Sequence, residues 1–359
     1  MSYKELKSKL ESEIKKASQV FIIGHNYPDF DSIGSAIGLY VLAKSFKKAA
    51  YIIVDEDGEK LEPGVKRILD KHKASVNFIK KEAYEKFVNS RSLLILTDVN
   101  KKNRVAIGDN LDKIKRVIII DHHSEDEETI VTDMKYNSLI VSSASEIVSR
   151  ILSDFKVKYT PDVANSLLAG ISLDTKRFKA NTSSQTFDIA KKLVANGADI
   201  DEVNALFLEE FESFARISNL IINGTVIQKY SEDTLSPIQV SFTINRNMPK
   251  TIYNVEDYAK AADRMLKFIG IDAAFTLGYI DEETIHISAR GGKKVNVGKI
   301  MNEMNGGGNN QCAGGRIVSD DIFDVENRLK EKIIYGLADD EEIAEVPKVI
   351  KIKQISRKK

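Results

Sequence analysis

The sequence contains one cysteine, Cys312, and no tryptophan. A single cysteine excludes a disulfide within the chain and argues against a zinc site built from several thiolates. No run of about 18 or more apolar residues is present, and a membrane-spanning helix needs that length. Residues 1–16 are charged and amphipathic, and they lack the apolar core of a signal peptide. We therefore expect a cytoplasmic protein with no membrane partner.

An excess of one charge is also missing. The 53 Lys and Arg residues balance the 53 Asp and Glu residues, so the formal net charge is zero. Proteins that bind long nucleic acid usually carry a strong basic excess, because neutralisation of phosphates dominates their affinity. The composition therefore disfavours long nucleic acid as a partner and favours a small or short anionic ligand.

Short apolar runs alternate with helical patterns in the first half of the chain. VFIIGH (20–25), SLLILTDV (92–99) and VIIIDHH (117–123) are apolar until their last residues, and SIGSAIGLYVLAKSF (32–46) has a helical pattern. Apolar strands that alternate with helices are typical of a parallel sheet covered on both faces. The pattern predicts an N-terminal α/β domain with a doubly wound, mostly parallel sheet.

The remainder of the chain predicts a helical stretch followed by a second, smaller α/β domain. Helical patterns continue from about residue 141 to about 228, and one long connecting helix is expected near 200–222. Strand-like and helical patterns resume from about residue 236. The predicted segments are an N-terminal domain (1–198), a helical linker (199–235), a second domain (236–338) and a charged tail (339–359).

Carboxylates and imidazoles gather where the predicted strands and helices end. The set is His25, Asp29, Asp31, Asp98, Asp121, His122, His123 and Asp174. The carboxyl ends of parallel strands meet at one edge of the sheet, where ligands bind. Taken singly, each residue has an ordinary explanation, such as Asp31 capping a helix. Several carboxylates in one crevice repel each other unless a cation neutralises them, so the set predicts a metal site.

The ligand types narrow the choice of metal. Aspartate oxygens with only one or two imidazoles suit manganese or magnesium better than zinc. Two such ions that share one carboxylate can clamp a phosphoryl oxygen and activate a water. The sequence therefore favours metal-assisted chemistry on a phosphate.

Several segments resemble a known family. Four motifs are similar to those of the DHH phosphoesterase superfamily, and they are, in chain order, HNYPDFDS (25–32), TD (97–98), DHH (121–123) and LDT (173–175). Three later motifs resemble its DHHA1 partner domain, namely ISAR (287–290), VNV (295–297) and GGG (306–308). The likeness covers about residues 18–335. It implies that the N-terminal domain is catalytic and that the second domain binds substrate.

The resemblance implies a centre of two divalent ions, with manganese expected first and magnesium or cobalt as alternatives. The implied ligands are His25 and Asp29 for one ion and Asp31, His122 and Asp174 for the other, with Asp98 bridging both.

The resemblance also implies three catalytic residues, which are Asp98, Asp121 and His123. His123 would face the scissile phosphate, and Asp121 would orient the histidines. A hydroxide held between the two ions would attack phosphorus.

Within the superfamily, residues 167–207 and VSSASEIV (141–148) resemble the cyclic-di-AMP phosphodiesterase branch most closely. That branch hydrolyses cyclic di-AMP to linear pApA, and onward cleavage to AMP is left open. The runner-up is the branch of oligoribonucleases and 3′-phosphoadenosine-5′-phosphate phosphatases. RecJ-type exonucleases and pyrophosphatases fit less well. A nucleotide sensor without turnover is the non-enzyme alternative. A homodimer is expected from the family.

The predicted substrate contacts are Arg290, Gly306, Gly307, Gly308, Asn309, Ser143 and Arg104. A glycine run can expose backbone N–H groups to a phosphate or a base. In the family this run leads into a histidine, whereas this sequence has Asn309 there. An amide cannot carry a positive charge to a phosphate, so Arg290 becomes the leading candidate for that contact.

Overall fold

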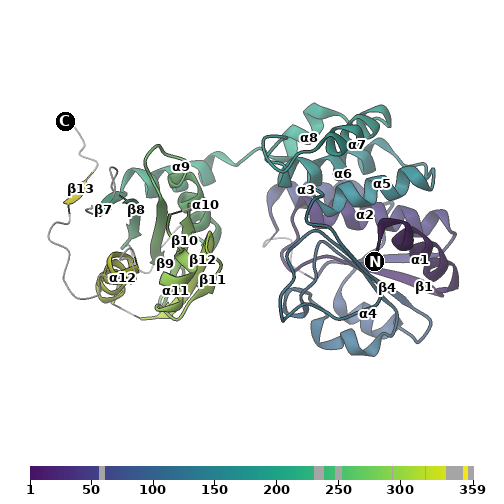
Figure 1. The fold of residues 1–359 in the computed structure, drawn as a ribbon, viewed down its shortest axis with the longest axis horizontal. Coiled ribbons are helices and arrows are strands. Elements are labelled where there is room, and N and C mark those ends of the chain that lie inside the picture. The colour runs from purple at the N-terminus through teal and green to yellow at the C-terminus, as the bar shows by residue number, and fades with distance from the viewer. Residues whose placement is uncertain are drawn as a thin grey trace. The chain divides into compact units, whose positions relative to one another are not determined.

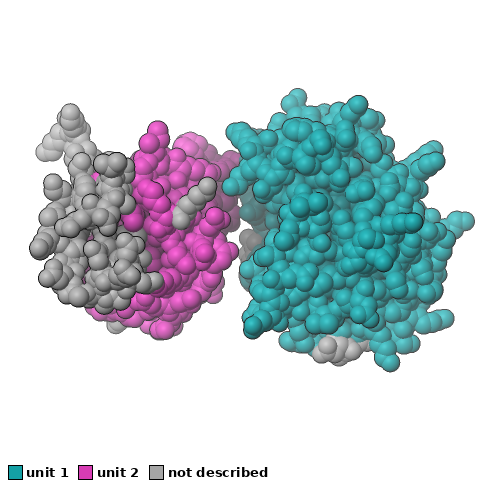
Figure 2. Space-filling view, viewed as in Figure 1, with its two compact units in different colours: residues 1–208 teal, residues 209–359 magenta. Residues whose placement is uncertain are grey.

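The computed structural model describes residues 1–55, 61–229, 238–246, 253–292, 294–319 and 321–336, together with the backbone of 351–354. The chain divides into two compact units, residues 1–208 and 209–359, which Figure 2 colours separately. Residues 230–235 of the predicted linker lie outside the described residues, and so does the predicted tail apart from 351–354.

Unit 1 (residues 1–208) is built on a six-stranded parallel sheet with the order β3-β2-β1-β4-β5-β6. The strands are β1 (Gln19–Ile23), β2 (Ala49–Ile53), β3 (Phe78–Ile79), β4 (Leu93–Thr97), β5 (Val117–Asp121) and β6 (Lys135–Asn137). The chain moves outward from β1 to β3 and then in the opposite direction from β4 to β6. The predicted doubly wound parallel sheet is therefore confirmed, and its switch point lies between β1 and β4.

Both faces of this sheet are covered (Figure 1). Val20 and Ile22 of β1 point into one core cluster, whereas Phe21 and Ile23 point into another. The first cluster includes helices α1 (Tyr3–Lys16), α2 (Phe30–Ser45), α3 (Pro63–His72), α5 (Ala144–Asp154), α6 (Pro161–Asp174), α7 (Ser184–Ala195) and α8 (Ile200–Leu206). The second cluster includes α4 (Lys81–Phe87) and the segment with the short helices η2 (Lys102–Arg104) and η3 (Gly108–Lys113).

Unit 2 (residues 209–359) contains a seven-stranded mixed sheet with the order β11-β12-β10-β9-β8-β7-β13. Its strands are β7 (Thr225–Lys229), β8 (Ile238–Asn245), β9 (Ala273–Tyr279), β10 (Thr284–Gly291), β11 (Gly307–Gly308), β12 (Cys312–Val318) and β13 (Lys351–Gln354). Its helices are α9 (Phe211–Ile222), α10 (Val255–Met265), α11 (Val297–Asn302) and α12 (Ile322–Gly336). Helix α10 covers one face, and α11 and α12 cover the other, so the smaller α/β unit is confirmed. In neither unit does a described helix have both the length and the apolarity that a bilayer crossing needs.

The stretch between the sheets differs from the prediction. The long helix expected near 200–222 is two helices, α8 and α9, and residues 225–229 form strand β7 instead of continuing the helical pattern. Phe207 ends α8, and its ring packs at 4.7 Å, in an edge-on arrangement, against the ring of Phe30. This tertiary contact overrides the local helical preference, and Gly224 follows the end of α9 before β7 begins.

Helix α2 lies close to α5 and α6 because glycines occupy the contact positions. A Cβ atom at Gly34 would lie 2.4 Å from the carbonyl oxygen of Ser166, and one at Gly38 would lie 2.6 Å from Cγ1 of Val148. A Cβ atom at Gly170 of α6 would lie 2.8 Å from Oδ1 of Asp31. The close approach of these helices therefore determines where α2 places its first turn.

We expect Gly34→Ala to lower the free energy of unfolding by about 1–3 kcal/mol, because the added methyl group meets a backbone oxygen that cannot move aside easily. Chemical denaturation of the full chain measures this change. Gly307→Ala is the matched control, since no heavy atom lies within 4 Å of a Cβ atom at that position. Equal stability of the two variants would contradict the packing argument.

Candidate metal centre

The predicted ligands converge at the carboxyl edge of the unit 1 sheet. His25 follows β1, Asp98 follows β4, and His122 follows β5, and these three strands are neighbours in the sheet. Asp31 lies in the first turn of α2, and Asp174 is the last residue of α6. Because α2 and α6 pack against each other, they bring their carboxylates to the same edge.

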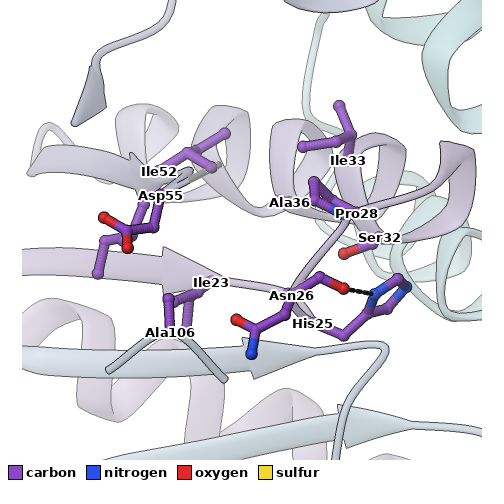
Figure 3. Close-up of a pocket in the computed structure, with 12 residues that line it drawn as sticks. Ile23, His25, Asn26, Pro28, Ser32, Ile33, Ala36, Ile52, Asp55 and Ala106 are labelled. Atoms are coloured by element: carbon purple, nitrogen blue, oxygen red, sulfur yellow. Dashed lines mark hydrogen bonds between the residues drawn. The ribbon is translucent and has the colours of Figure 1, made fainter. Parts of the chain in front are cut away.

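One group of ligands consists of His25, Asp29 and Asp98. Nε2 of His25 lies 3.7 Å from Oδ2 of Asp29 and 3.5 Å from Oδ2 of Asp98. Nδ1 of His25 lies 2.8 Å from the carbonyl oxygen of Asn26, to which it donates (Figure 3). That bond leaves Nε2, which faces the carboxylates, as the nitrogen that could bind a metal once it gives up its proton.

Asp29 is held by the helix that it begins. It is the N-cap of α2, and its Oδ1 accepts from the N–H groups of Asp31 at 2.9 Å and Ser32 at 3.0 Å. Oδ2 faces His25. The cap therefore fixes one oxygen on the backbone and leaves the other for a cation.

A second group consists of Asp31, His122 and Asp174. Nε2 of His122 lies 3.6 Å from Oδ2 of Asp31 and 3.4 Å from Oδ2 of Asp174. The two oxygens of Asp31 accept from the N–H groups of Ala144 and Ser145, each at 2.7 Å. The first turn of α5 therefore holds the buried Asp31 carboxylate in place.

Asp98 lies between the two groups. Its Oδ2 faces His25, whereas its Oδ1 lies 3.2 Å from Nε2 of His122. The side chain is almost fully buried, and the backbone has φ +58°. One carboxylate with an oxygen toward each group is the geometry that a bridging ligand requires.

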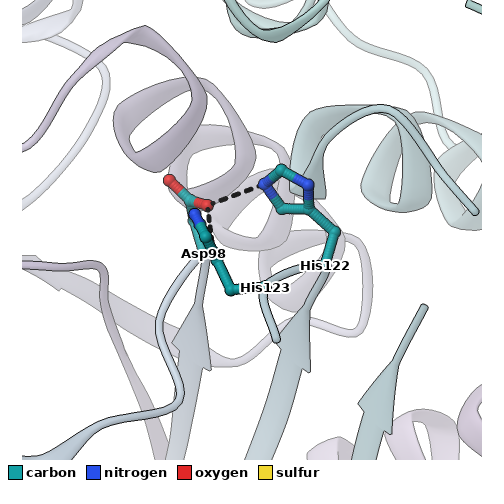
Figure 4. A group of neighbouring side chains, drawn as sticks. All are labelled: Asp98, His122 and His123. Atoms are coloured by element: carbon teal, nitrogen blue, oxygen red, sulfur yellow. Dashed lines mark hydrogen bonds and ion pairs between the residues drawn. The ribbon is translucent and has the colours of Figure 1, made fainter. Parts of the chain in front are cut away.

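His123 and Asp121 form a hydrogen-bonded pair beside this centre. Nδ1 of His123 lies 2.9 Å from Oδ1 of the fully buried Asp121 and 3.5 Å from Oδ1 of Asp98. Figure 4 shows one oxygen of Asp98 facing both His122 and His123. The His123 side chain is 54% exposed, so its ring can reach a ligand while Asp121 holds its orientation. The hydrogen bond that Nδ1 of His123 donates to Asp121 raises the pKa of His123 above its ordinary value.

The concentration of carboxylates changes the pKa values of the ligands. Burial raises the pKa of Asp31 and of Asp174 well above the usual carboxyl range, and neighbouring carboxylates add to this. Burial alone would lower the pKa of His25 and of His122, but the surrounding carboxylates outweigh it and raise these values to about 11 and about 10. Without a cation, protons must offset the negative charge.

The residues present fit a divalent ion in each group. Oδ2 of Asp174 is buried and has no hydrogen-bond partner, and a cation would satisfy it. The ligand atoms within each group lie within 4.8 Å of one another. A donor set rich in carboxylate oxygen, with one imidazole in each group, suits manganese or magnesium. Each group could therefore hold one such ion.

Two predicted substrate contacts lie in unit 1. The carbonyl oxygen of Arg104 accepts the N–H of Asn26 at 2.7 Å, so the exposed Arg104 is adjacent to the loop that carries His25. Ser143 is fully buried and is the N-cap of α5, where its hydroxyl accepts from Glu146 N–H at 3.0 Å. A role of either residue in substrate binding stays a prediction.

The other predicted contacts lie in unit 2. Nε of Arg290 donates to Oδ1 of Asp263 at 2.8 Å, so part of its guanidinium group is engaged. Oδ1 of Asn309 accepts from the N–H groups of Gln311 and Cys312, which places this residue in the turn between β11 and β12. Gly306, Gly307 and Gly308 precede that turn, and Gly307 has open space beside it.

Sequence reasoning missed two parts of the centre. The carbonyl group of Asn26 that fixes the His25 tautomer left no signal in the sequence. The N–H groups of Ala144 and Ser145 that hold Asp31 did leave one. Ser143 followed three residues later by Glu146 is a pattern that marks the N-terminus of a helix.

We expect Asp98→Asn to weaken the binding of manganese by roughly a hundredfold or more, because the change removes the charge of the carboxylate shared by both groups. Calorimetric titration of the metal-free protein with manganese measures the affinity and the number of ions. Asp188→Asn, an exposed change on α7, is the matched control and should leave the titration unaltered. An unchanged affinity in Asp98→Asn would contradict the shared-ligand geometry.

Known proteins are similar to this chain in sequence. The family model for the DHH family, N-terminal domain, matches residues 19–171, and that for the DHHA1 domain matches residues 237–334. The chain is 32% identical over 335 residues to the cyclic-di-AMP phosphodiesterase GdpP of Bacillus subtilis, covering 90% of this chain and 49% of the relative. It is 30% identical to the cyclic-di-AMP phosphodiesterase PdeA of Listeria monocytogenes, covering 89% of this chain and 48% of the relative. The chain thus spans about half the length of these relatives.

Two further comparisons cover nearly the whole length of the other protein. The chain is 23% identical to the bifunctional oligoribonuclease and PAP phosphatase NrnA of Thermus thermophilus, covering 91% of this chain and 93% of the relative. Among solved structures, an exopolyphosphatase-related protein from Bacteroides fragilis matches the fold with a TM-score of 0.72 at 21% identity, covering 92% of this chain and 96% of that one. With both domain matches in this order, the chain belongs to the DHH family and carries a DHHA1 domain.

Proposed function

We propose that this chain is a metal-dependent phosphodiesterase that hydrolyses cyclic di-AMP to linear pApA. The observation that carries this proposal is one carboxylate, Asp98, shared between two groups of ligands that could each hold a divalent ion. The likeness to cyclic-di-AMP phosphodiesterases over about nine tenths of the chain supports the choice of substrate.

The many carboxylates of the centre support the proposal that the active protein contains bound divalent ions. Without cations, protons offset the negative charge of Asp29, Asp31, Asp98 and Asp174, and divalent ions would displace these protons on binding. Bound divalent ions, manganese first and magnesium or cobalt as alternatives, neutralise charge on phosphoryl oxygens and lower the pKa of a water that can attack phosphorus. The ligands proposed are His25 and Asp29 for one ion and Asp31, His122 and Asp174 for the other, with Asp98 shared.

His123 is proposed to act on the phosphate. Asp121 holds its Nδ1, so Nε2 of the half-exposed ring can donate a hydrogen bond to a phosphoryl oxygen or a proton to the departing oxygen. Opening the ring at the bond between phosphorus and O3′ leaves a 3′-hydroxyl that needs such a proton. The other phosphodiester stays intact, so the product is pApA.

A second candidate is hydrolysis of very short RNA or of 3′-phosphoadenosine 5′-phosphate. The observation that favours it is the likeness to NrnA of Thermus thermophilus, which extends over 93% of that protein. The same groups of ligands would serve this reaction, so the substrate must be decided by experiment.

We expect purified protein with manganese to convert cyclic di-AMP into pApA faster than it attacks any other member of a substrate panel. The panel contains cyclic di-GMP, pApA, a short RNA, 3′-phosphoadenosine 5′-phosphate and pyrophosphate, and chromatography separates the products. Faster cleavage of the short RNA or of 3′-phosphoadenosine 5′-phosphate would select the second candidate. Binding of cyclic di-AMP without any product would identify a sensor.

We expect Asp98→Ala to reduce kcat on the preferred substrate by roughly a thousandfold or more, because charge stabilisation by both ions depends on this side chain. Steady-state kinetics at saturating manganese measures the loss. Asp188→Ala keeps full activity if the effect is local. An Asp98→Ala protein with wild-type kcat would rule out the proposed mechanism.

A further inference from the structure

A turn of left-handed backbone begins two residues after Asp174. Lys176, Arg177 and Phe178 have φ values of +49°, +59° and +62°. This conformation is strained for an L-residue and usually occurs at a single Gly or Asn where a helix ends. Three consecutive residues of this kind, none of them glycine, are unusual, and such strain concentrates at functional sites.

Hydrogen bonds from the end of α6 hold this turn. The N–H of Arg177 donates to the carbonyl oxygen of Ser172 at 2.7 Å, and that of Lys179 donates to the carbonyl oxygen of Thr175 at 2.8 Å. The hydroxyl of Thr175, which is fully buried, accepts the N–H of Phe178 at 3.0 Å. The protein therefore fixes the left-handed turn without a ligand.

The turn carries three cations. Lys176, Arg177 and Lys179 are exposed, and none of them forms an ion pair with a carboxylate among the described residues. The guanidinium carbon of Arg177 lies 5.1 Å from the centre of the Phe207 ring, and that ring packs against Phe30, which adjoins Asp31. Arg177 is thereby anchored beside the first turn of α2.

The position of these cations indicates what they bind. They adjoin an acidic centre without neutralising any of its carboxylates, so their charge is available to a ligand. In the proposed function, divalent ions would bind the phosphate that is cleaved. A dinucleotide carries a second phosphate, and no ion is proposed to bind that one. We infer that the basic turn, residues 176–179, binds this second phosphate of the substrate, an inference that rests on the proposed function.

The test compares substrates with one and with two phosphates. The variants are Lys176→Gln, Arg177→Gln, Lys179→Gln and the triple change, assayed with cyclic di-AMP and with bis(p-nitrophenyl) phosphate. A hydrogen bond to a charged group contributes about 1.5–3 kcal/mol, so the triple variant should raise KM for cyclic di-AMP by about tenfold or more. We expect kcat, and KM for the one-phosphate ester, to change by less than about twofold, since neither involves the turn.

The matched control replaces Lys158, Lys191 and Lys192 together with Gln, because these lysines are also exposed in unit 1. An equal rise in KM in this control would assign the effect to net charge and overturn the inference. So would a triple variant that loses no more affinity for cyclic di-AMP than for bis(p-nitrophenyl) phosphate.

The inference and the proposed function can fail separately. If cyclic di-AMP is not cleaved, the proposed function is wrong, and the same variants are assayed with pApA or 3′-phosphoadenosine 5′-phosphate, each of which also has two phosphates. If neither is cleaved, calorimetry of cyclic di-AMP binding in the presence of manganese replaces KM. Unchanged affinity in the triple variant then overturns the inference.

Lys176→Gly distinguishes the effect of the charged side chain from the effect of backbone strain at this position. Glycine adopts positive φ without strain, so this variant should unfold at an equal or higher denaturant concentration than the wild type. It should still raise KM for cyclic di-AMP as much as Lys176→Gln does. A Gly variant with wild-type KM would show that the side chain of Lys176 does not contact the substrate.

Discussion

Mutual repulsion among four carboxylates is the constraint on which unit 1 depends. Asp29 and Asp31 come from the start of α2, Asp98 follows β4, and Asp174 ends α6. None of the four pairs with a lysine or an arginine among the described residues. Backbone N–H groups of α2 and α5 hold two of these carboxylates instead. A helix N-terminus carries a partial positive charge, so it lowers the repulsion without occupying the space between the carboxylates. That space suits cations.

The helical core sets the geometry of this centre. Asp31 lies in contact with the first turn of α5, and Gly170 of α6 leaves it the room that a side chain would fill. Movement of either helix would therefore displace the Asp31 carboxylate. Asp174, at the end of α6, depends on the same packing. A centre that costs stability through buried charge thus rests on the closely packed helices α2, α5 and α6, which keep its ligands in place.

Much of this arrangement could be predicted from the sequence, because it depends on patterns of residue type. The apolar runs that precede His25, Asp98 and His122 predicted the parallel sheet, and they also predicted the edge of the sheet where the ligands meet. Features that depend on backbone geometry could not be predicted in the same way. The carbonyl contact of His25, the break at Phe207 and the left-handed turn that begins at Lys176 arise from tertiary contacts, which residue types alone do not reveal.

Asn309, the departure from the expected motif, forms hydrogen bonds with the backbone of its own turn. Its Oδ1 accepts two N–H groups, from Gln311 at 2.9 Å and from Cys312 at 2.8 Å. A carbonyl oxygen has two lone pairs for this purpose, whereas an imidazole nitrogen has one, so a histidine could not make both bonds. The amide therefore stabilises the turn between β11 and β12, with Gly308 at φ +140° before it. The contacts of Asn309 thus assign it a structural role in this glycine hairpin, and a role in substrate binding stays a prediction.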